Sequence, residues 1–175
     1  RLLRHDGDHF TDITAEAGIS SSRLGYGLSA IEADLDRDGW PDLYVCNDFH
    51  EDDYLYLNQQ DGSYRESLRA WIGHTSKFSM GGDLADFNND GHADLITLDM
   101  KPEVEFIRKT AQPPASYDRY QYKLSFGYYY QYAHNALQLN RGGQGFSEIA
   151  QLAGVDATDW SWSALFADYD NDGYK

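Results

Sequence analysis

The sequence predicts an all-β fold composed of β-propeller blades. One block of sequence recurs three times along the 175 residues, and each copy consists of short runs of alternating apolar residues separated by Asp-Gly or Gly-Gly turns. No segment shows the periodicity of a long amphipathic helix that could compete for the core. Four strands in each unit of about 50 residues fit a propeller blade. The alternative is a β-sandwich in which the repetition is coincidental.

The recurring block ends each time in a run of aspartates. The three runs begin at Asp34, Asp86 and Asp168, and each is preceded by an alanine and, eight residues upstream, by an aromatic residue. The runs start 52 and then 82 residues apart, so the second unit carries about 30 extra residues. We therefore expect repeats at about 10–66 and 67–148, the latter with a tyrosine-rich insertion at 101–134, followed by a truncated repeat at 149–175.

Each repeat predicts its strands in the same order. In the first repeat we expect strands at Tyr26–Ala33 and Leu43–Asn47, followed by a hairpin of Leu55–Asn58 and Ser63–Glu66. The hairpin motif LYLNQQDGSY returns as LQLNRGGQGF in the second repeat, and FTDITAEAGIS near the N-terminus returns as FSEIAQLAGVD. The stretch Ala15–Gly18 is at most one turn of helix.

Composition excludes several functions. The 14 basic and 29 acidic residues give a net charge of −15, which opposes binding to nucleic acids and to anionic membranes. No run approaches the roughly 18 apolar residues that a membrane span needs. The single cysteine, Cys46, lies in an apolar run, where we expect it to be buried rather than nucleophilic. The chain starts at Arg1 without a signal sequence and stops within a motif, so we expect an excised piece of a longer protein.

The aspartate runs predict metal sites. Oxygen-bearing side chains occupy positions 1, 3, 5 and 9 of each run, and glycine occupies position 6. The side-chain positions are Asp34, Asp36, Asp38 and Asp42; Asp86, Asn88, Asp90 and Asp94; and Asp168, Asp170 and Asp172, after which the chain ends before position 9. Alternate residues of a tightly curled loop direct their oxygens toward one centre, and the glycine permits the turn.

Calcium is the cation that these loops favour. It accepts six to eight oxygen ligands in flexible geometry, and neither Cys nor His is placed in the loops to favour zinc. Position 12 is Val45 or Thr97 rather than the glutamate of an EF-hand, so the loop closes at position 9. We expect the backbone carbonyl at position 7 to complete each shell. The residues at position 7 are Trp40, His92 and Tyr174. The alternative is an Asp-rich turn without metal.

These motifs resemble a known family. The stretches ADLDRDGWPDLYV and ADFNNDGHADLIT resemble the FG-GAP/VCBS calcium-binding blades of integrin-α-like β-propellers. Their combination with the hairpin and FSEIAQLAG motifs is similar to the secreted cartilage-acidic-protein-like group, whose bacterial members often end in an ASPIC/UnbV domain. The resemblance implies a propeller of about seven blades, of which this chain supplies about three. The ASPIC/UnbV region is absent from this sequence.

Catalytic motifs do not stand out from the rest of the sequence. We find no recognisable Ser/His/Asp set, Cys/His pair or carboxylate pair. Catalysis by calcium is also not expected, because protein ligands fill most of its coordination shell and leave no evident open position for a substrate. The acidic run from Asn47 to Asp53 contains His50 and has two interpretations, a second metal site or, preferably, a solvated loop between strands.

The insertion is the most individual segment of the chain. It holds seven of the fourteen tyrosines and five of the fourteen basic residues, and it follows the second strand of its blade, so it lies on the face opposite the aspartate loops. Tyrosine and arginine suit sugars or anionic partners. The possible ligand face consists of Tyr128, Tyr129, Tyr130 and Tyr132. The alternative is a lid whose tyrosines pack on neighbouring blades.

The sequence thus predicts a calcium-stabilised, non-enzymatic propeller module that binds a protein or glycan in adhesion. Because cytosolic calcium would leave such sites largely empty, we expect an exported protein, either extracellular, periplasmic or on the cell surface. The alternative is a carbohydrate-active enzyme or its accessory domain, which would require two carboxylates about 5–9 Å apart in a cleft.

Overall fold

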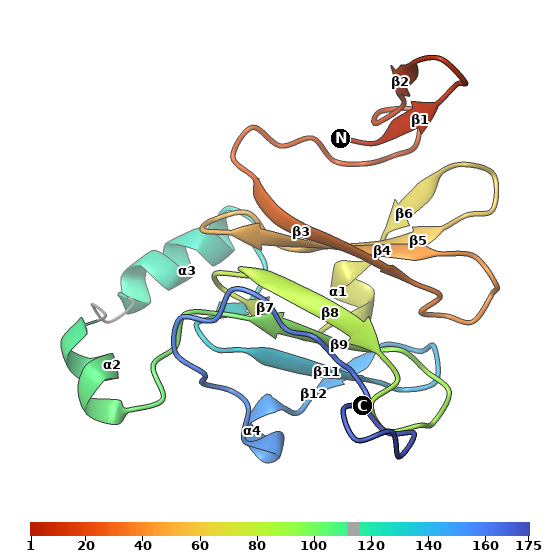
Figure 1. The fold of residues 1–175 in the computed structure, drawn as a ribbon. Coiled ribbons are helices and arrows are strands. Elements are labelled where there is room, and N and C mark those ends of the chain that lie inside the picture. Colours follow the sequence, from red (N-terminus) through yellow and green to blue (C-terminus); the bar gives the residue numbers. More distant parts are fainter. Residues whose placement is uncertain (112–115) are drawn as a thin grey trace.

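Two four-stranded antiparallel sheets stacked on one another form the body of the protein (Figure 1). The computed structural model describes residues 1–111 and 116–175. The first sheet contains β3 (Tyr26–Ala33), β4 (Asp42–Asp48), β5 (Tyr54–Asn58) and β6 (Tyr64–Glu66), which pair in chain order. We call this sheet the first blade. The predicted strands of the first repeat are therefore confirmed to within one residue.

The second blade repeats this arrangement around the insertion. Its strands β8 (Gly81–Ala85), β9 (Asp94–Leu98), β11 (Ala136–Asn140) and β12 (Phe146–Glu148) also pair in chain order. Between β9 and β11 lie α2 (Glu105–Ala111), α3 (Tyr117–Ser125) and β10 (Gln131–Tyr132). The two helices are not part of the all-β prediction, which holds for the blades alone. β10 pairs in parallel with β7 (Thr75–Ser76), which ties the insertion back to the segment that joins the blades.

The core lies between the two sheets. Along β4, Tyr44 and Cys46 face the second blade, whereas Leu43 and Val45 border a hollow on the other side of the sheet. This alternation follows from the two-residue period of a strand. Cys46 is fully buried, as its apolar run predicts, and burial raises the pKa of its thiol well above the ordinary range. The buried cluster consists of Leu35, Tyr44, Cys46, Leu55, Leu57, Leu68, Ile72, Leu95 and Phe146.

The last segment of the chain lies along β8 without forming a strand of its own. The amide of Phe166 donates a hydrogen bond to Asp83 at 2.7 Å, and the rings of Phe87 and Phe166 stack at 6.0 Å. Gly81 lies so close to this segment that an added Cβ would be 2.6 Å from the carbonyl oxygen of Trp162. The described residues thus form two complete blades and no closed ring.

A carboxylate caps the turn that follows each outer strand. Glu66 accepts the amide of Leu68 at 2.8 Å, and Glu148 accepts the amide of Ala150 at 2.6 Å. These bonds open the short helices α1 (Leu68–Trp71) and α4 (Ala150–Ala153). Asp12, at the end of β2 (Phe10–Asp12), accepts the amide of Thr14 in the same way. The recurring acidic residue of the FTDI and FSEI motifs therefore accepts the backbone amide two residues further along the chain and stabilises the turn there.

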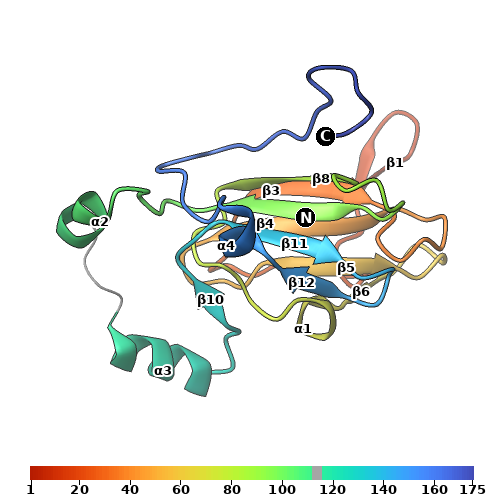
Figure 2. The same ribbon diagram turned by 90° about the horizontal axis from the view of Figure 1, so that it is seen from below.

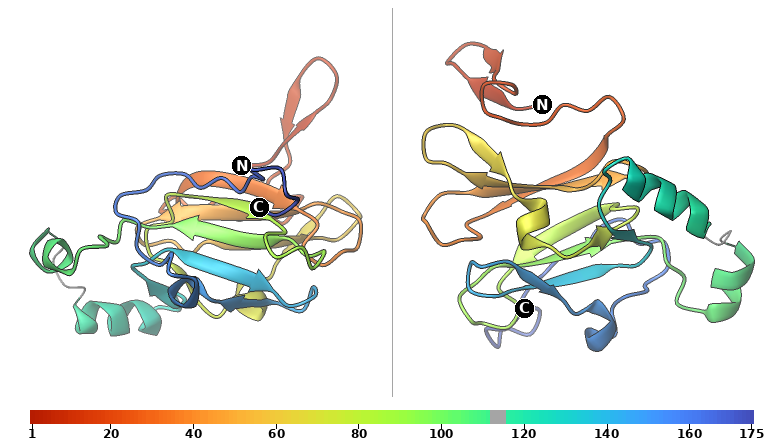
Figure 3. Two further views of the ribbon diagram at one scale, coloured as in Figure 1. Left: turned by 60° about the horizontal axis from the view of Figure 1, so that its bottom comes forward. Right: turned by 180° about the vertical axis from the view of Figure 1, so that it is seen from behind.

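The N-terminal β1 (Leu3–His5) pairs only with β2, and this small hairpin stands apart from the blades (Figures 1 and 3). Residues 13–25 then lead back to β3 across the outer side of the first blade. Among the described residues, no helix combines the length and the apolar character needed to cross a membrane.

A buried carboxylate joins the two blades at the end opposite the aspartate loops. Asp53 accepts hydrogen bonds from the amide of Asn47 at 2.7 Å, from the hydroxyl of Tyr44 at 2.6 Å, and from the hydroxyl of Ser79 at 2.6 Å. Ser79 belongs to the segment that enters the second blade. Burial outweighs these donors and raises the pKa of Asp53 from 3.8 to about 7.

This raised pKa predicts a pH dependence of stability in metal-free buffer. The folded state holds the Asp53 proton more tightly than the unfolded state, so Asp53 contributes stability that is fully present below pH 3.8 and is lost as the pH rises to about 7. We expect the loss to approach ~1.4 kcal/mol per pH unit within this window. Asp53→Asn should flatten the dependence, whereas Asp118→Asn on the exposed face of α3 should not. Urea unfolding with EDTA between pH 4 and pH 8 measures this, and equal slopes for wild type and Asp53→Asn would contradict it.

Candidate metal centre

The three aspartate loops share one backbone conformation. The glycine at position 6, which is Gly39, Gly91 or Gly173, has φ of +88°, +86° or +93°. The residue at position 4 is also left-handed in every loop, with φ of 63° at Arg37, 58° at Asn89 and 61° at Asn171. Asparagine tolerates this conformation, but arginine rarely adopts it. The sequence pattern predicts the turn at glycine and gives no sign of the second left-handed residue.

Side-chain oxygens hold each loop closed. The first aspartate accepts the amide of the position 6 glycine, at 2.9 Å for Asp34, 2.8 Å for Asp86 and 2.8 Å for Asp168. The position 5 aspartate accepts the amide of the position 7 residue. These pairs are Asp38 with Trp40, Asp90 with His92, and Asp172 with Tyr174. The third loop keeps this geometry although the chain ends before its ninth position.

The carboxylates converge to different extents. In the first loop, oxygens of Asp34, Asp36 and Asp42 lie within 4.8 Å of one another, and in the third loop those of Asp168, Asp170 and Asp172 do so. Asp38 is outside the first group, and its second oxygen accepts a hydrogen bond from Gln60 at 2.8 Å.

In the second loop the carboxylates are farther apart. Asp86, Asp90 and Asp94 form no comparably close group among the described residues. There the amide nitrogen of Asn88 donates to Asp90 at 3.0 Å.

One buried oxygen in the first loop lacks a partner. Asp34 Oδ1 is inaccessible to solvent and has no hydrogen bond among the described residues, whereas Oδ2 holds Gly39. Burial and the neighbouring carboxylates of Asp38 and Asp34 raise the pKa of Asp36. A buried acceptor without a donor is costly. Three clustered carboxylates, one with a free buried oxygen, fit a hard cation with oxygen ligands such as calcium.

The aspartate at position 9 also holds the blade together. Both oxygens of Asp42 accept amides, from Leu35 in the loop and from Asn58 at the end of β5, each at 2.9 Å. Asp94 does the same with Phe87 at 3.3 Å and with Asn140 at 2.8 Å. Burial raises the pKa of both aspartates, and the other loop carboxylates raise it further.

The asparagine of the LYLN and LQLN motifs completes this arrangement. Asn58 donates through its side chain to the carbonyl of Pro41, and Asn140 donates to that of Ala93. The sequence shows both asparagines as a repeat but gives no indication that they contact the loops.

Neighbouring loops touch at the same end of the molecule. The guanidinium of Arg37 lies against Gly91 of the second loop, and the side-chain amide of Asn89 donates to the carbonyl of Gly173 in the third loop at 2.9 Å. The tip of the β11–β12 hairpin packs on the first loop, because an added Cβ at Gly143 would be 3.1 Å from the carbonyl oxygen of Asp36. The loops therefore form a row at one end of the stacked blades (Figure 1).

The insertion lies at the other end (Figures 1 and 2), as the strand order predicts. Tyr129 is packed, since its hydroxyl donates to the carbonyl of Ile72 at 2.9 Å and the guanidinium of Arg69 lies over its ring. Tyr128 is half-buried beneath the ammonium of Lys123. Tyr130 and Tyr132 are exposed. The predicted ligand face therefore divides into packed and exposed tyrosines.

Two hollows adjoin the insertion. One of about 410 Å³ is bordered by aromatic and basic side chains, among them Tyr117, Tyr120, Arg119, Lys77 and Lys123. The other, of about 670 Å³, lies between α3 and the first blade. Its lining consists of Leu24, Tyr26, Phe49, His50, Tyr122, Lys123, Phe126 and Tyr128. Neither lining includes an aspartate or glutamate among the described residues.

The acidic run from Asn47 to Asp53 is only in part the solvated loop that the sequence favours, because Phe49 and His50 are exposed whereas Asn47, Asp48 and Asp53 are buried. Asp52 accepts the backbone amide of Tyr129 at 3.0 Å and pairs with Arg69 at 3.3 Å. The carbonyl of Glu51 accepts the side-chain amide of Gln131 at 2.9 Å. The run lies next to the base of the insertion in space, and the carboxylate of Asp52 and the backbone carbonyl of Glu51 fasten the insertion to the first blade.

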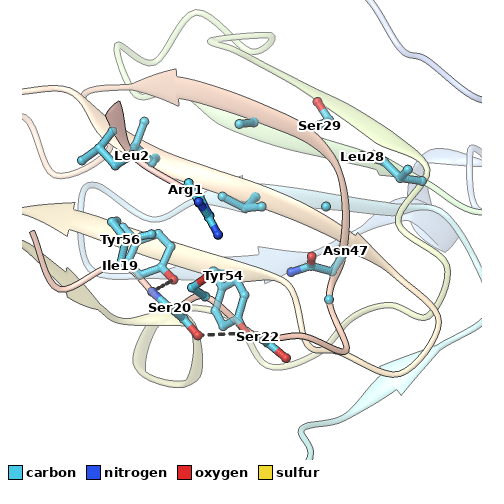
Figure 4. A pocket seen from close by; sticks show the side chains of 16 residues that line it. Arg1, Leu2, Ile19, Ser20, Ser22, Leu28, Ser29, Asn47, Tyr54 and Tyr56 are labelled. Atoms are coloured by element: carbon cyan, nitrogen blue, oxygen red, sulfur yellow. Dashed lines mark hydrogen bonds between the residues drawn. The ribbon is translucent and has the colours of Figure 1, made fainter. Parts of the chain in front are cut away.

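A third hollow, of about 420 Å³, lies on the outer face of the first blade (Figure 4). Tyr54 and Tyr56 of β5 face Ser20, whose amide donates to the Tyr56 hydroxyl at 3.0 Å. Arg1 and Leu2 border the same hollow. No sequence motif predicts this hollow, because it forms where residues 1–25 cross the sheet.

The architecture is thus that of a repeat protein whose four-stranded blades each carry an aspartate loop between the first and second strands. Comparison with protein families identifies an FG-GAP-like repeat at residues 34–97. The match begins at Asp34, the first residue of the first loop, and ends within β9. A comparison of the chain with curated proteins gives no match.

We expect Asp34→Asn to weaken calcium binding without weakening the metal-free fold. Asparagine can still accept the amide of Gly39, but it removes one charge from a crowded group. The calcium-dependent rise in melting temperature should fall, with at least a tenfold loss of affinity at this loop, while the melting temperature in EDTA stays equal or rises. Asp61→Asn, in the turn between β5 and β6, is the matched control. An equal loss of stability with and without calcium would show that Asp34 is not a ligand.

Asp42→Ala should behave differently, because it leaves two amides of the blade without an acceptor. We expect a loss of about 2–4 kcal/mol both in calcium and in EDTA. Chemical denaturation under both conditions measures the loss. A large loss of stability seen only in buffer that contains calcium would mean that Asp42 acts only as a metal ligand.

Proposed function

We propose that this chain is part of a calcium-stabilised β-propeller of an exported protein that binds a protein or glycan ligand. The observation that carries the proposal is the row of aspartate loops with a common backbone, in which Asp34 retains a free buried oxygen. The resemblance of the loops to calcium-binding FG-GAP blades, and the FG-GAP-like repeat at residues 34–97, point the same way.

Calcium would be held by side chains already placed for it. In the first loop these are Asp34, Asp36 and Asp42, which lie together, with Asp38 released from Gln60. In the second loop Asp86, Asn88, Asp90 and Asp94 would have to draw together. The ion would neutralise the mutual repulsion of the carboxylates. When the free calcium concentration is 100 times the dissociation constant, one site would stabilise the fold by about 2.7 kcal/mol. Millimolar calcium outside cells favours an exported location.

The ligand would bind at the end that carries the insertion. The hollow of about 410 Å³ combines tyrosine rings with the cations of Lys77, Arg119 and Lys123. This lining is suited to stacking on sugars and to pairing with acidic groups. The alternative is a carbohydrate-active enzyme. It would need a pair of carboxylates beside the sugar, and this lining favours binding because its described residues supply none.

A glycan and peptide array probed with the calcium-loaded chain tests the proposal. Tyr117, which borders the hollow, is 73% exposed. We therefore expect Tyr117→Ala to lower the affinity for any ligand found at least tenfold, with no change in melting temperature. Tyr129→Ala should instead destabilise the fold by about 2–3 kcal/mol, because its ring packs beside the core. Phe106→Ala on α2 is the exposed control. Retained binding by Tyr117→Ala would place the ligand elsewhere.

A further inference from the structure

A second group of metal-binding side chains lies away from the aspartate loops. His74 precedes β7, His134 follows β10 and Glu148 ends β12. One ligand atom from each lies within 4.8 Å of the other two. The three residues are separated by 60 and 14 positions in the sequence, and the pairing of β7 with β10 brings the two histidines together. Their rings are 5.4 Å apart.

The orientation of His134 leaves one ring nitrogen free. Its Nδ1 lies 2.6 Å from the carbonyl oxygen of Asn135, which can only accept, so Nδ1 carries the proton. Nε2 of the neutral ring therefore has an available lone pair. A backbone carbonyl that fixes the tautomer in this way is the usual partner of a metal-binding histidine. His134 is only 8% exposed.

His74 presents a buried nitrogen without a partner. Its Nε2 is inaccessible to solvent and has no hydrogen bond among the described residues. The nearest carboxylate oxygen, Glu148 Oε2, is 3.8 Å away, which is too far for a hydrogen bond. Burial and the neighbouring His134 lower the pKa of His74, against the opposing effect of Glu148.

Glu148 is held so that one oxygen faces the histidines. Its Oε1 accepts the amides of Ala150 at 2.6 Å and Leu137 at 3.3 Å, which leaves Oε2 toward His74. Ligands around a tetrahedral zinc ion, at about 2.0–2.1 Å from it, are roughly 3.3–3.4 Å apart. The 3.8 Å separation between Nε2 and Oε2 is therefore close to the spacing that an ion between them would impose.

We propose that His74, His134 and Glu148 bind a divalent transition metal of the zinc class, at a site separate from the calcium loops. Two imidazoles and one carboxylate are a donor set that zinc prefers and calcium does not. Three protein ligands leave a fourth position for water. The ring of Tyr132, which also borders the hollow beside α3, contacts both histidines.

The first blade supplies a matched control. Glu66 occupies the position equivalent to Glu148 and makes the equivalent bond, in which its Oε1 accepts the backbone amide of Leu68. No histidine accompanies it in a close group among the described residues. Glu66→Gln and Glu148→Gln both keep the accepting oxygen, so only Glu148→Gln removes a proposed ligand.

Calorimetric titration of the full chain with zinc, in saturating calcium to occupy the aspartate loops, tests the site. We expect one zinc ion per chain and at least a tenfold loss of affinity in His74→Gln, His134→Gln and Glu148→Gln. Glu66→Gln and His50→Gln should bind zinc as the wild type does. Cobalt in place of zinc should give the visible absorption of a tetrahedral site with nitrogen ligands, and this absorption should disappear in His74→Gln.

Two results would overturn the proposal. One is the absence of zinc binding by the wild type in calcium. The other is equal binding by wild type and Glu148→Gln, which would place the ion elsewhere. Melting in EDTA checks the fold, because a Glu148→Gln variant that melts with the wild type and fails to bind zinc supports ligation directly. If the chain bound zinc in this way but showed no calcium-dependent rise in melting temperature, the proposed function would be refuted and this site would still stand.

Discussion

The carboxylate at position 9 of the aspartate loop is the group on which each blade depends. Asp42 and Asp94 each accept one amide from the loop and one from the third strand, while their own backbone begins the second strand. One side chain thereby fixes three segments. Burial raises the pKa of both aspartates, so the fold bears a desolvation cost that two amides offset in part and that a cation would offset further.

The opposite end of the blades repeats a different polar contact. The amide of Asn47 donates to Asp53, and the amide of Asp99 donates to Asn135 at 2.8 Å, at equivalent positions of the two blades. Each acceptor side chain then reaches the following segment. Asp53 accepts from Ser79 and Asn135 donates to Thr158 at 2.8 Å. Because each of the two blades binds the segment that follows it through this buried group, the contact is directional as well as hydrophobic.

The sequence predicts those parts of the structure that repeat. A strand, a loop and a hairpin recur at fixed offsets, so local chemistry is enough to place β3–β6 and the Asp loops. Prediction from the sequence fails where contacts join segments that lie outside the repeated pattern. His74, His134 and Glu148 meet only because the insertion returns as β10 beside β7. The run around Asp52 is polar in sequence, but the folded insertion covers Asp52 in part and accepts its carboxylate as a partner for the amide of Tyr129.

Donor chemistry separates the two proposed metal sites within one blade. The second blade carries oxygen donors in the β8–β9 loop and the two histidines with Glu148 beside β7, β10 and β12. Hard cations gain little from imidazole, and zinc-class ions gain more from it than from scattered carboxylates. At the histidine site, the carbonyl of Asn135 orients His134 and the amide of Ala150 holds Glu148, so two of the three ligands are fixed by the backbone. An ion at the proposed histidine site would clamp the base of the insertion to the blade, because its ligands come from beside β7, β10 and β12.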